Sequence, residues 1–309
     1  MRRFASRTTP KIPRVLIVGF GDIGERVARL LGPRYQISAL VRTPARARRA
    51  HELAVQPVRG DLANPRSLEK LAGTADIVFH FAPPPANGAT DVHTRNLLAA
   101  LHRQSGRSGM LSQRPLRRIV YISTTGVYGD CGGARIDESR ALRPATMRAK
   151  RRVDAERRLC RWGRRHGAAV SILRAPGIYS ETRLPAERLR KGTPALVAEE
   201  DVFTNHIHAE DLARAAIAAM RYARPGRVYN VVDDSALAMG EYFDLVADAY
   251  ALPRPARVTR KQAASMLSPM LLSFMSESRR IGNARVKRDL RLKLKFPTVA
   301  DCLRAFARG

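Results

Sequence analysis

Cysteine, aromatic residues and long apolar runs are all scarce in this chain of 309 residues. The three cysteines, Cys131, Cys160 and Cys302, are far apart and form no C-x-x-C pair. This argues against a disulfide framework or a cysteine zinc site, and we expect a reducing, cytoplasmic environment. No run of about 18 apolar residues occurs, so we expect no membrane span. Residues 1–13 contain several arginines but no apolar core, so we expect no secretory signal there.

Acidic residues are also few, with 27 Asp and Glu against 56 Lys and Arg, which gives a formal net charge of +29. Such a charge can indicate a nucleic-acid partner, for which the most basic segment, 135–165, would be the binding face. However, aromatic residues make up only 6% of the chain, and no segment alternates basic with aromatic residues. We interpret the charge as a general bias towards arginine and expect a small-molecule substrate rather than nucleic acid.

The most informative stretch is residues 15–31, where an apolar run is followed by glycines and then by helical periodicity. The run Val15 to Val18 leads into Gly19-Phe20-Gly21-Asp22-Ile23-Gly24. A G-x-G-x-x-G motif between a strand and a helix is typical of dinucleotide binding. The first glycine permits a tight turn, the second a close approach to pyrophosphate, and the third packing of helix on strand. The following helix directs its N-terminus at the phosphates. The alternative is a fortuitous glycine cluster.

The second predicted strand, 35–41, ends at Arg42, and several further arginines follow. At this point of a Rossmann unit an acid binds the ribose 2′-OH of NAD, whereas an arginine accommodates the 2′-phosphate of NADP. No Asp or Glu occurs between Gln36 and Arg49. The sequence therefore favours NADP over NAD, unless Arg42 is simply one more surface arginine.

Strand and helix patterns alternate along most of the chain, which predicts an α/β fold with a Rossmann-type doubly wound parallel sheet. Ligands of such sheets bind outside the carboxyl ends of the strands. We expect residues 12–180 and 206–232 to form an NAD(P)-binding domain. Residues 181–205 and 233–309 would form a small C-terminal substrate-binding lobe. The predicted strands are 15–18, 35–41, 55–59, 75–81, 118–123, 170–174 and 227–232, and the main predicted helices are 23–31, 64–71, 91–103, 146–166, 207–222 and 239–250.

Several short segments, in this order, carry a family resemblance. They are the glycine loop, Gly60-Asp61-Leu62, Asp76 to Ala82, Tyr121 to Gly129, Leu173 to Tyr179, His206 to Leu212 and Tyr229-Asn230-Val231. From Val15 to about Phe296 the chain resembles the extended short-chain dehydrogenase/reductase superfamily, of the NAD-dependent epimerase/dehydratase type. The resemblance implies that Asp61 contacts adenine and that Pro176 and Ile178 lie beside the nicotinamide. It also implies that the cofactor touches Leu62 and the strand end at Phe81, Ala82 and Pro83.

In that family a tyrosine and a lysine four residues later carry out proton transfer, and a Ser or Thr binds the reacting carbonyl. The resemblance places the hydroxyl at Thr124. Aligned on Glu156, it places Arg148 at the tyrosine position and Arg152 at the lysine position. A shifted register would place Thr146 and Lys150 there instead. Neither register supplies a tyrosine.

An arginine does not deprotonate in proteins, so Arg148 cannot be a general acid or base. Arg148 and Arg152 share one helix face, where two guanidinium groups suit a phosphate, a carboxylate or the cofactor. Tyr128 and Tyr179, which the resemblance places at strand carboxyl ends, are alternative proton donors unless they are packing residues. His206 and His208 lack a third ligand at known spacing, so we expect no metal site.

Two hypotheses follow. The first is an atypical NADP-preferring oxidoreductase or epimerase-type enzyme that acts on a small substrate, for which an anion is one candidate. The second is a non-catalytic NADP(H)-binding regulator that has lost the Tyr–Lys pair.

Many relatives dimerise through the helices that correspond to 91–103 and 146–166. The helix 146–166 is so rich in arginine that pairing two copies across a two-fold axis would bring like charges together. The sequence is therefore compatible with a monomer as well as with a homodimer.

Overall fold

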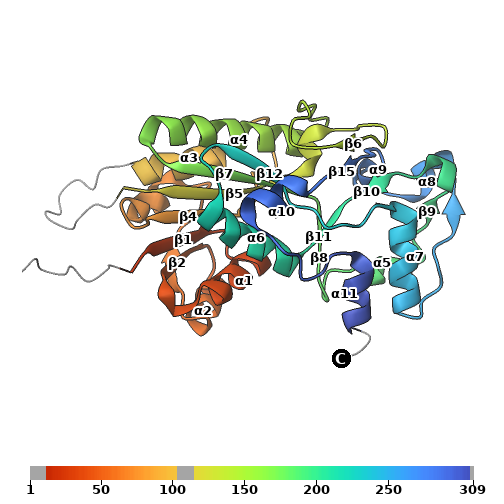
Figure 1. The fold of residues 1–309 in the computed structure, drawn as a ribbon, viewed down its shortest axis with the longest axis horizontal. Coiled ribbons are helices and arrows are strands. Elements are labelled where there is room, and N and C mark those ends of the chain that lie inside the picture. The colour runs from red at the N-terminus through yellow and green to blue at the C-terminus, as the bar shows by residue number, and fades with distance from the viewer. Residues whose placement is uncertain (1–11, 103–114, 307–309) are drawn as a thin grey trace, which may run out of the picture.

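The computed structural model describes residues 12–102 and 115–306, and a seven-stranded parallel sheet forms its centre (Figure 1). The strand order is β12-β7-β5-β4-β1-β2-β3. The predicted doubly wound α/β fold is therefore confirmed. The strands are β1 (Arg14–Val18), β2 (Gln36–Val41), β3 (Gln56–Arg59), β4 (Ile77–His80), β5 (Arg118–Thr124), β7 (Ala169–Ala175) and β12 (Arg227–Asn230).

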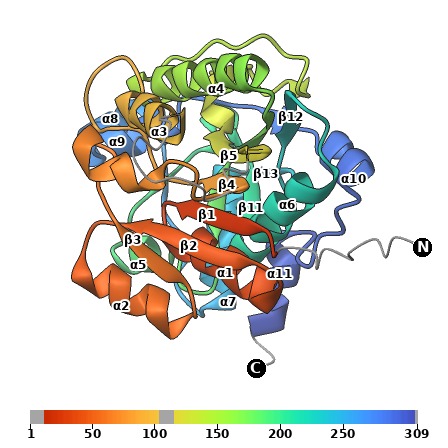
Figure 2. The same cartoon turned by 90° about the vertical axis from the view of Figure 1, so that its left-hand side faces the viewer.

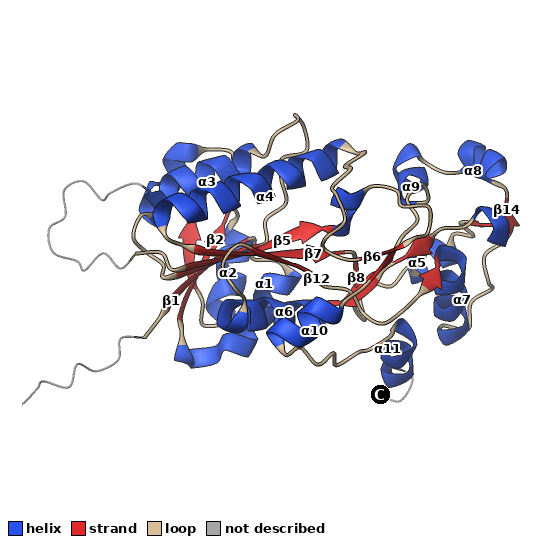
Figure 3. Cartoon of the chain, turned by 45° about the horizontal axis from the view of Figure 1, so that its top comes forward, coloured by secondary structure: helices blue, strands red, loops and turns tan. Residues whose placement is uncertain are grey.

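Helices cover both faces of the sheet, as Figures 2 and 3 show. One face packs against α1 (Asp22–Leu31), α2 (Pro44–Glu52), α6 (Ala209–Tyr222) and α10 (Ala284–Leu290). The other packs against α3 (Val92–His102) and α4 (Met147–His166). Alternate residues of β1 point to opposite faces, so Val15 and Ile17 join the first core whereas Leu16 and Val18 join the second. This two-sided burial explains why the central strands are continuously apolar.

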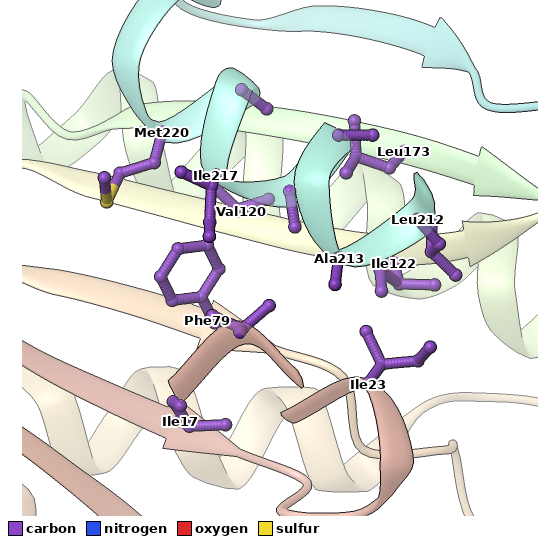
Figure 4. Packing of buried hydrophobic residues seen from close by; sticks show 14 of the residues in the cluster. Ile17, Ile23, Phe79, Val120, Ile122, Leu173, Leu212, Ala213, Ile217 and Met220 are labelled. Carbon is purple, nitrogen blue, oxygen red and sulfur yellow. The ribbon is translucent and has the colours of Figure 1, made fainter. Parts of the chain in front are cut away.

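The first core fills the space between α1, α6 and the middle of the sheet (Figure 4). Ile17, Phe79 and Val120, from three neighbouring strands, face Ile23 of α1 and Ile217 of α6. All five side chains are buried. Because this core holds the start of α1 against the end of β1, it fixes the loop between them.

A smaller part of the molecule lies at one end of the sheet, opposite α2 and α3 (Figure 1). It has its own apolar core of residues from α5, α7, α8 and α11. Its helices are α5 (Ala186–Arg190), α7 (Met239–Ala249), α8 (Arg260–Met266), α9 (Pro269–Phe274) and α11 (Val299–Phe306), and its strand pairs are β9 (Ala195–Leu196) with β14 (Arg257–Val258) and β10 (Phe203–Thr204) with β13 (Leu237–Ala238). Two further short strand pairs are β8 (Gly177–Tyr179) with β11 (His206–His208), whose isoleucines pack with the first sheet core, and β6 (Arg135–Ile136) with β15 (Arg280–Ile281).

The predicted division into a nucleotide-binding domain and a substrate lobe stays a prediction. Val286, Leu290 and Leu292 of the last third of the chain pack into the first sheet core beside α6. Asp211 of α6 holds the chain that follows, since its carboxylate accepts hydrogen bonds from the backbone N–H groups of Lys295 and Phe296. The C-terminal segment therefore contacts the sheet side before it reaches α11.

Two predicted helices differ from the structure. Residues 65–71 form a 3-10 helix, in which the Ser67 hydroxyl donates to the carbonyl oxygens of Asp61 and Asn64. Such local bonds compete with the α-helical pattern. The predicted helix 207–222 starts later, at Ala209, because residues 206–208 pair with β8 as strand β11. Residues 103–114, which include the last residue of the predicted helix 91–103, lie outside the described part. No helix within the described ranges is long and apolar enough to cross a bilayer.

Candidate functional site

The glycine loop joins β1 to α1 at the carboxyl edge of the sheet, and its glycines have different structural roles. Gly19 has a φ of 98°, and a Cβ there would lie 2.7 Å from the Phe81 carbonyl carbon and still closer to the Ala82 nitrogen. A Cβ on Gly24 would lie 2.8 Å from the Gly19 carbonyl oxygen. Both positions therefore require glycine to let neighbouring backbone pack. Gly21 has no heavy atom within 4 Å of a Cβ, so its free side faces open space.

A cavity of about 440 Å³, the nucleotide pocket, opens beside this loop. Most of the predicted cofactor residues line it: Gly19, Phe20, Gly21, Arg42, Asp61, Leu62, Phe81, Ala82 and Pro83. The lining also includes Thr43, Arg46 and His93, which the sequence did not single out. Predicted residues outside this lining are Asp22, Ile23 and Gly24 on α1 and Pro176 and Ile178 further along the edge. A glycine-walled cavity at a helix N-terminus fits a dinucleotide.

The end of the nucleotide pocket next to β2 is basic. Arg42 and Arg46 both line it, and Asp61 is the one carboxylate in the described lining. The Arg46 guanidinium donates to Glu25 of α1 at 3.2 Å, and Glu25 also pairs with Arg49. Glu25 therefore ties the first turns of α2 to α1 and restrains Arg46 near the pocket.

A second cavity of about 570 Å³, the substrate pocket, lies further along the strand ends. It brings together the predicted residues Thr124, Arg148, Arg152, Pro176 and Ile178, which come from β5, α4 and the segment after β7. Phe203, Asn205 and Met239 of the smaller part form the opposite wall. The pocket thus lies between the sheet and the C-terminal elements.

Thr124 is the last residue of β5, and its Oγ1 accepts a hydrogen bond from the Gly126 N–H at 3.2 Å. This bond caps the short 3-10 helix Thr125–Tyr128 and fixes the Thr124 side chain at the pocket edge. A hydroxyl that accepts one bond still has its own proton to donate. Thr124 is therefore positioned to donate to an oxygen of a molecule in the pocket.

Arg152 is held by strand β5. Its Nη1 donates to the Tyr121 hydroxyl and to the Ile122 carbonyl oxygen, both at 2.9 Å. Burial raises the pKa of Tyr121 to about 12, so the phenol is neutral and accepts from the arginine. Arg148, one turn earlier on α4, is exposed and lines the same pocket. The two guanidinium groups therefore share the α4 face that borders the substrate pocket.

The two tyrosines considered as proton donors lie behind the pocket wall. Tyr128 is fully buried, and its hydroxyl donates to Asn230 Oδ1 at 2.7 Å and accepts from Arg174 Nη1 at 2.9 Å. Tyr179 is buried in the core of the smaller part. Burial raises the pKa of both phenols. Neither tyrosine lines the substrate pocket, so the structure does not place the Tyr128 hydroxyl in contact with a molecule bound there.

The substrate pocket is strongly cationic. Arg148, Arg152, Arg183 and Arg279 line it, and Glu277 is the one carboxylate in the described lining. Glu277 pairs with Arg279 at 2.7 Å. Sequence patterns gave no signal for Arg183 or Arg279, because both come from irregular segments far from the motifs.

The histidines that could suggest a metal have structural roles. His208 Nδ1 accepts the Glu210 N–H at the start of α6, and burial lowers the pKa of His206 to about 3. Among the described residues, no group of three or more His, Cys, Asp or Glu side chains could hold a metal ion.

The outer face of α3 and α4 is basic, as the sequence suggested. Arg95, Arg158, Arg161 and Arg165 surround Trp162 in a shallow groove between the two helices. The Trp162 ring stacks on His166 with ring centroids 4.4 Å apart. Self-association through this face would bring like charges together, but oligomeric state and nucleic-acid binding stay predictions.

The NAD dependent epimerase/dehydratase family matches residues 15–232, which include the glycine loop, both pockets' strand ends and α4. The chain belongs to this family. The predicted family resemblance is thus confirmed, and a nicotinamide dinucleotide is the cofactor class expected of the family. The match does not distinguish NADP from NAD.

Individual relatives are distant. A dTDP-D-glucose 4,6-dehydratase from Homo sapiens is 22% identical over 195 residues, which cover 56% of this chain and 53% of the human protein. The chain thus matches about half the length of that relative. A functionally unknown conserved protein from Silicibacter pomeroyi has a TM-score of 0.76 and 26% identity, covering 96% of this chain and 98% of that protein. A UDP-glucuronic acid 4-epimerase from Bacillus cereus, solved with NAD, has a TM-score of 0.71 and 17% identity, covering 94% and 96%. That likeness shows the shared fold.

Proposed function

We propose that this protein is an NADP(H)-dependent enzyme of oxidoreductase or epimerase type that acts on a small anionic substrate. The observation that carries this proposal is the pairing of two pockets along one sheet edge. One pocket is walled by glycine backbone and the other is lined by Thr124 and arginine side chains. The cofactor would supply hydride transfer, and the residues of this chain would bind and orient the reactants.

The preference for NADP rests on Arg42 and Arg46 at the end of β2. Two guanidinium groups there suit a 2′-phosphate, whereas NAD-binding sites present a carboxylate to the 2′-OH. The carboxylate in the described lining is Asp61, which follows β3 rather than β2. Asp61 suits the adenosine end, and Pro176 and Ile178 suit the nicotinamide end.

The preference for an anion rests on the charge of the substrate pocket. Its described lining has four arginines and one glutamate, so the lining has an excess of positive charge. Arg148 and Arg152 would bind a carboxylate or phosphate group of the substrate, and Thr124 would donate to the reacting oxygen. The proton would come from a group other than the usual tyrosine.

The second candidate is a non-catalytic regulator that binds NADP(H). One observation favours it: the described lining of the substrate pocket contains no tyrosine, histidine or lysine. Glu277, the remaining proton-exchanging group, is ion-paired with Arg279. A protein that senses the cofactor would need the nucleotide pocket but no proton donor.

Titration calorimetry with NADPH and NADH tests the cofactor assignment. We expect wild-type protein to bind NADPH more tightly and Arg42→Ala to weaken NADPH by about tenfold, because a charge-assisted hydrogen bond is lost. NADH binding should not change. The matched control is Arg48→Ala, since Arg48 is exposed on α2 and lies outside the pocket lining. Equal loss of NADH and NADPH affinity in Arg42→Ala would contradict the NADP assignment.

A screen for NADPH oxidation with carboxylate-bearing carbonyl compounds separates the two candidates. The enzyme hypothesis expects turnover that Thr124→Ala reduces by a factor of about 100 while NADPH affinity is retained. Tight NADPH binding without turnover on any such compound, or on sugar-type substrates, would favour the regulator.

A further inference from the structure

Arg183 reaches from the smaller part of the molecule back to the glycine loop. It lies in the turn after β8, and its Nη1 lies 3.5 Å from Oδ2 of Asp22, in the first turn of α1. This ion pair links segments 161 residues apart. No sequence motif predicted this contact.

The contact with Asp22 engages only Nη1 of the Arg183 guanidinium group. Asp22 already accepts a shorter bond, 2.7 Å, from Nε of Arg26. The Arg183 side chain is 47% exposed, and an ion pair of this length at the surface contributes little to stability. A guanidinium group has five N–H donors, so most of those of Arg183 are available to a ligand.

Arg183 lies between the two pockets. Its side chain lines the substrate pocket together with Thr124 and Ile178, whereas Gly19 and Gly21 line the nucleotide pocket. A dinucleotide that spans both pockets must pass its pyrophosphate across the N-terminus of α1, where Asp22 lies. Arg183 is therefore a cation at the crossing point of the two pockets.

The turn that carries Arg183 is restrained by a neighbouring charge network. Arg26 of α1 lies 3.7 Å from Glu181 and 3.2 Å from Glu210 of α6, while it also binds Asp22. Glu181 is two residues before Arg183, so Arg26 ties this turn to both helices. A ligand that binds Arg183 would thereby connect the smaller part of the molecule to the glycine loop.

We propose that Arg183 is a pyrophosphate clamp: on dinucleotide binding its guanidinium exchanges Asp22 for the pyrophosphate oxygens. A planar guanidinium group can donate two parallel hydrogen bonds to two phosphate oxygens. Its contact with Asp22 is a single, longer one at 3.5 Å. The bound guanidinium would also offset the negative charge that Asp22 places near the pyrophosphate. This inference rests on the proposed dinucleotide binding and adds a binding residue that lies outside the nucleotide loop.

Calorimetry with two ligands tests the clamp. The first is NADPH, or NADH if it binds more tightly, and the second is adenosine 2′-monophosphate, which has no pyrophosphate. We expect Arg183→Ala to weaken the dinucleotide about tenfold and to leave adenosine 2′-monophosphate unchanged, with Arg183→Lys intermediate. The matched control is Arg190→Ala, which removes an exposed arginine of α5 paired with Glu187 and should change neither affinity.

Asp22→Asn supplies a second test. It removes a negative charge beside the pyrophosphate and releases Arg183, so dinucleotide affinity should stay equal or rise. A loss as large as that of Arg183→Ala would overturn the clamp, because the ion pair itself would then be what binding requires. Unchanged dinucleotide affinity in Arg183→Ala would also overturn it and leave the proposed function standing. If wild-type protein binds neither nicotinamide dinucleotide, the proposed function fails first.

Discussion

The two pockets at the carboxyl edge of the sheet are built in different ways. The nucleotide pocket is shaped mainly by backbone, because Gly19 and Gly24 let the loop pack against β4 and α1. The substrate pocket is shaped by side chains from distant segments, among them Arg152 and Arg279. A backbone-built site keeps its shape when surface residues change, whereas a side-chain-built site changes chemistry with each substitution. This difference would explain how a chain of this family keeps its glycine loop while the side chains that line its other pocket include four arginines.

The largest expected effect comes from breaking the backbone-built pocket at Gly19. Gly19→Ala places a Cβ against the backbone of Phe81 and Ala82 at a φ of 98°. We expect the free energy of unfolding to fall by about 4 kcal/mol, from backbone strain and overpacking together. Urea unfolding followed by circular dichroism measures it, and dinucleotide binding should be lost.

Gly21→Ala is the matched comparison. A Cβ there meets no heavy atom within 4 Å, so stability should stay within about 0.5 kcal/mol of wild type. Dinucleotide affinity should still fall severalfold, because the methyl group would occupy the space that pyrophosphate needs. If Gly21→Ala bound cofactor normally, the open side of Gly21 would not face the ligand.

The next largest effect concerns a buried ion pair between β7 and α4. Arg174 of β7 donates to both oxygens of Glu156 on α4, at 2.7 and 3.1 Å, and both side chains are about 5% exposed. Glu156→Gln would leave a buried guanidinium without its carboxylate, at a cost of about 3 kcal/mol in unfolding free energy. The same substitution in an exposed pair, Glu187→Gln, should change stability by less than about 0.5 kcal/mol. Dinucleotide affinity of Glu156→Gln should remain near wild type; a tenfold loss would show that the pockets are not independent.

The sequence predicted the sheet, its flanking helices and the glycine loop, because apolar periodicity and glycine spacing are local signals. It also placed Thr124, Arg148 and Arg152 at one pocket, where the structure brings them together. What it could not predict was the direction of side chains after strand ends. The 3-10 turn after β5 carries Tyr128 into the interior, towards Asn230 and Arg174, which are distant in sequence.

The same limit applies to Arg183 and Arg279. Both lie in segments without regular periodicity, and their places in the pocket depend on how the smaller part packs on the sheet. In a chain with 56 basic residues, no pattern distinguishes a pocket arginine from a surface arginine. For Arg46 the sequence contains a weak signal, because it is one of several arginines that follow Arg42.

A pH effect of intermediate size is expected at Asp233, a buried carboxylate after β12. Its carboxylate accepts the Ser235 N–H at 2.9 Å, and burial raises its pKa to about 7. Between pH 4 and 7 the unfolded chain would release this proton while the folded protein keeps it, so the stability contribution of Asp233 falls as pH rises through that range. Asp233→Asn should therefore gain about 3 kcal/mol relative to wild type from pH 4.5 to pH 8.

Thermal or urea unfolding of both proteins at the two pH values measures this gain. Asp248→Asn is the control, because Asp248 is an exposed carboxylate whose pKa is lowered by its hydrogen bonds with Arg254. Its stability relative to wild type should fall slightly, not rise, over the same range. A constant difference between Asp233→Asn and wild type at all pH values would mean that Asp233 is ionised in the folded protein throughout.

Apart from the matched variants and controls, the smallest expected effect on stability comes from Tyr128→Phe, which tests whether Tyr128 serves packing or catalysis. Tyr128→Phe removes the hydroxyl that bridges Asn230 and Arg174, and we expect a stability loss of about 1 kcal/mol. Turnover on any substrate found should stay within about threefold of wild type, whereas loss of a general acid would lower it by a factor of about 100 or more. Tyr121→Phe is the matched variant, since Tyr121 is equally buried but holds Arg152 at the pocket. Its turnover should fall further than that of Tyr128→Phe, because the Arg152 guanidinium would keep only its bond to the Ile122 carbonyl oxygen and be less firmly held at the pocket. The reverse order, with Tyr128→Phe inactive and normally stable, would mean that the buried hydroxyl reaches the substrate in a conformation different from this one.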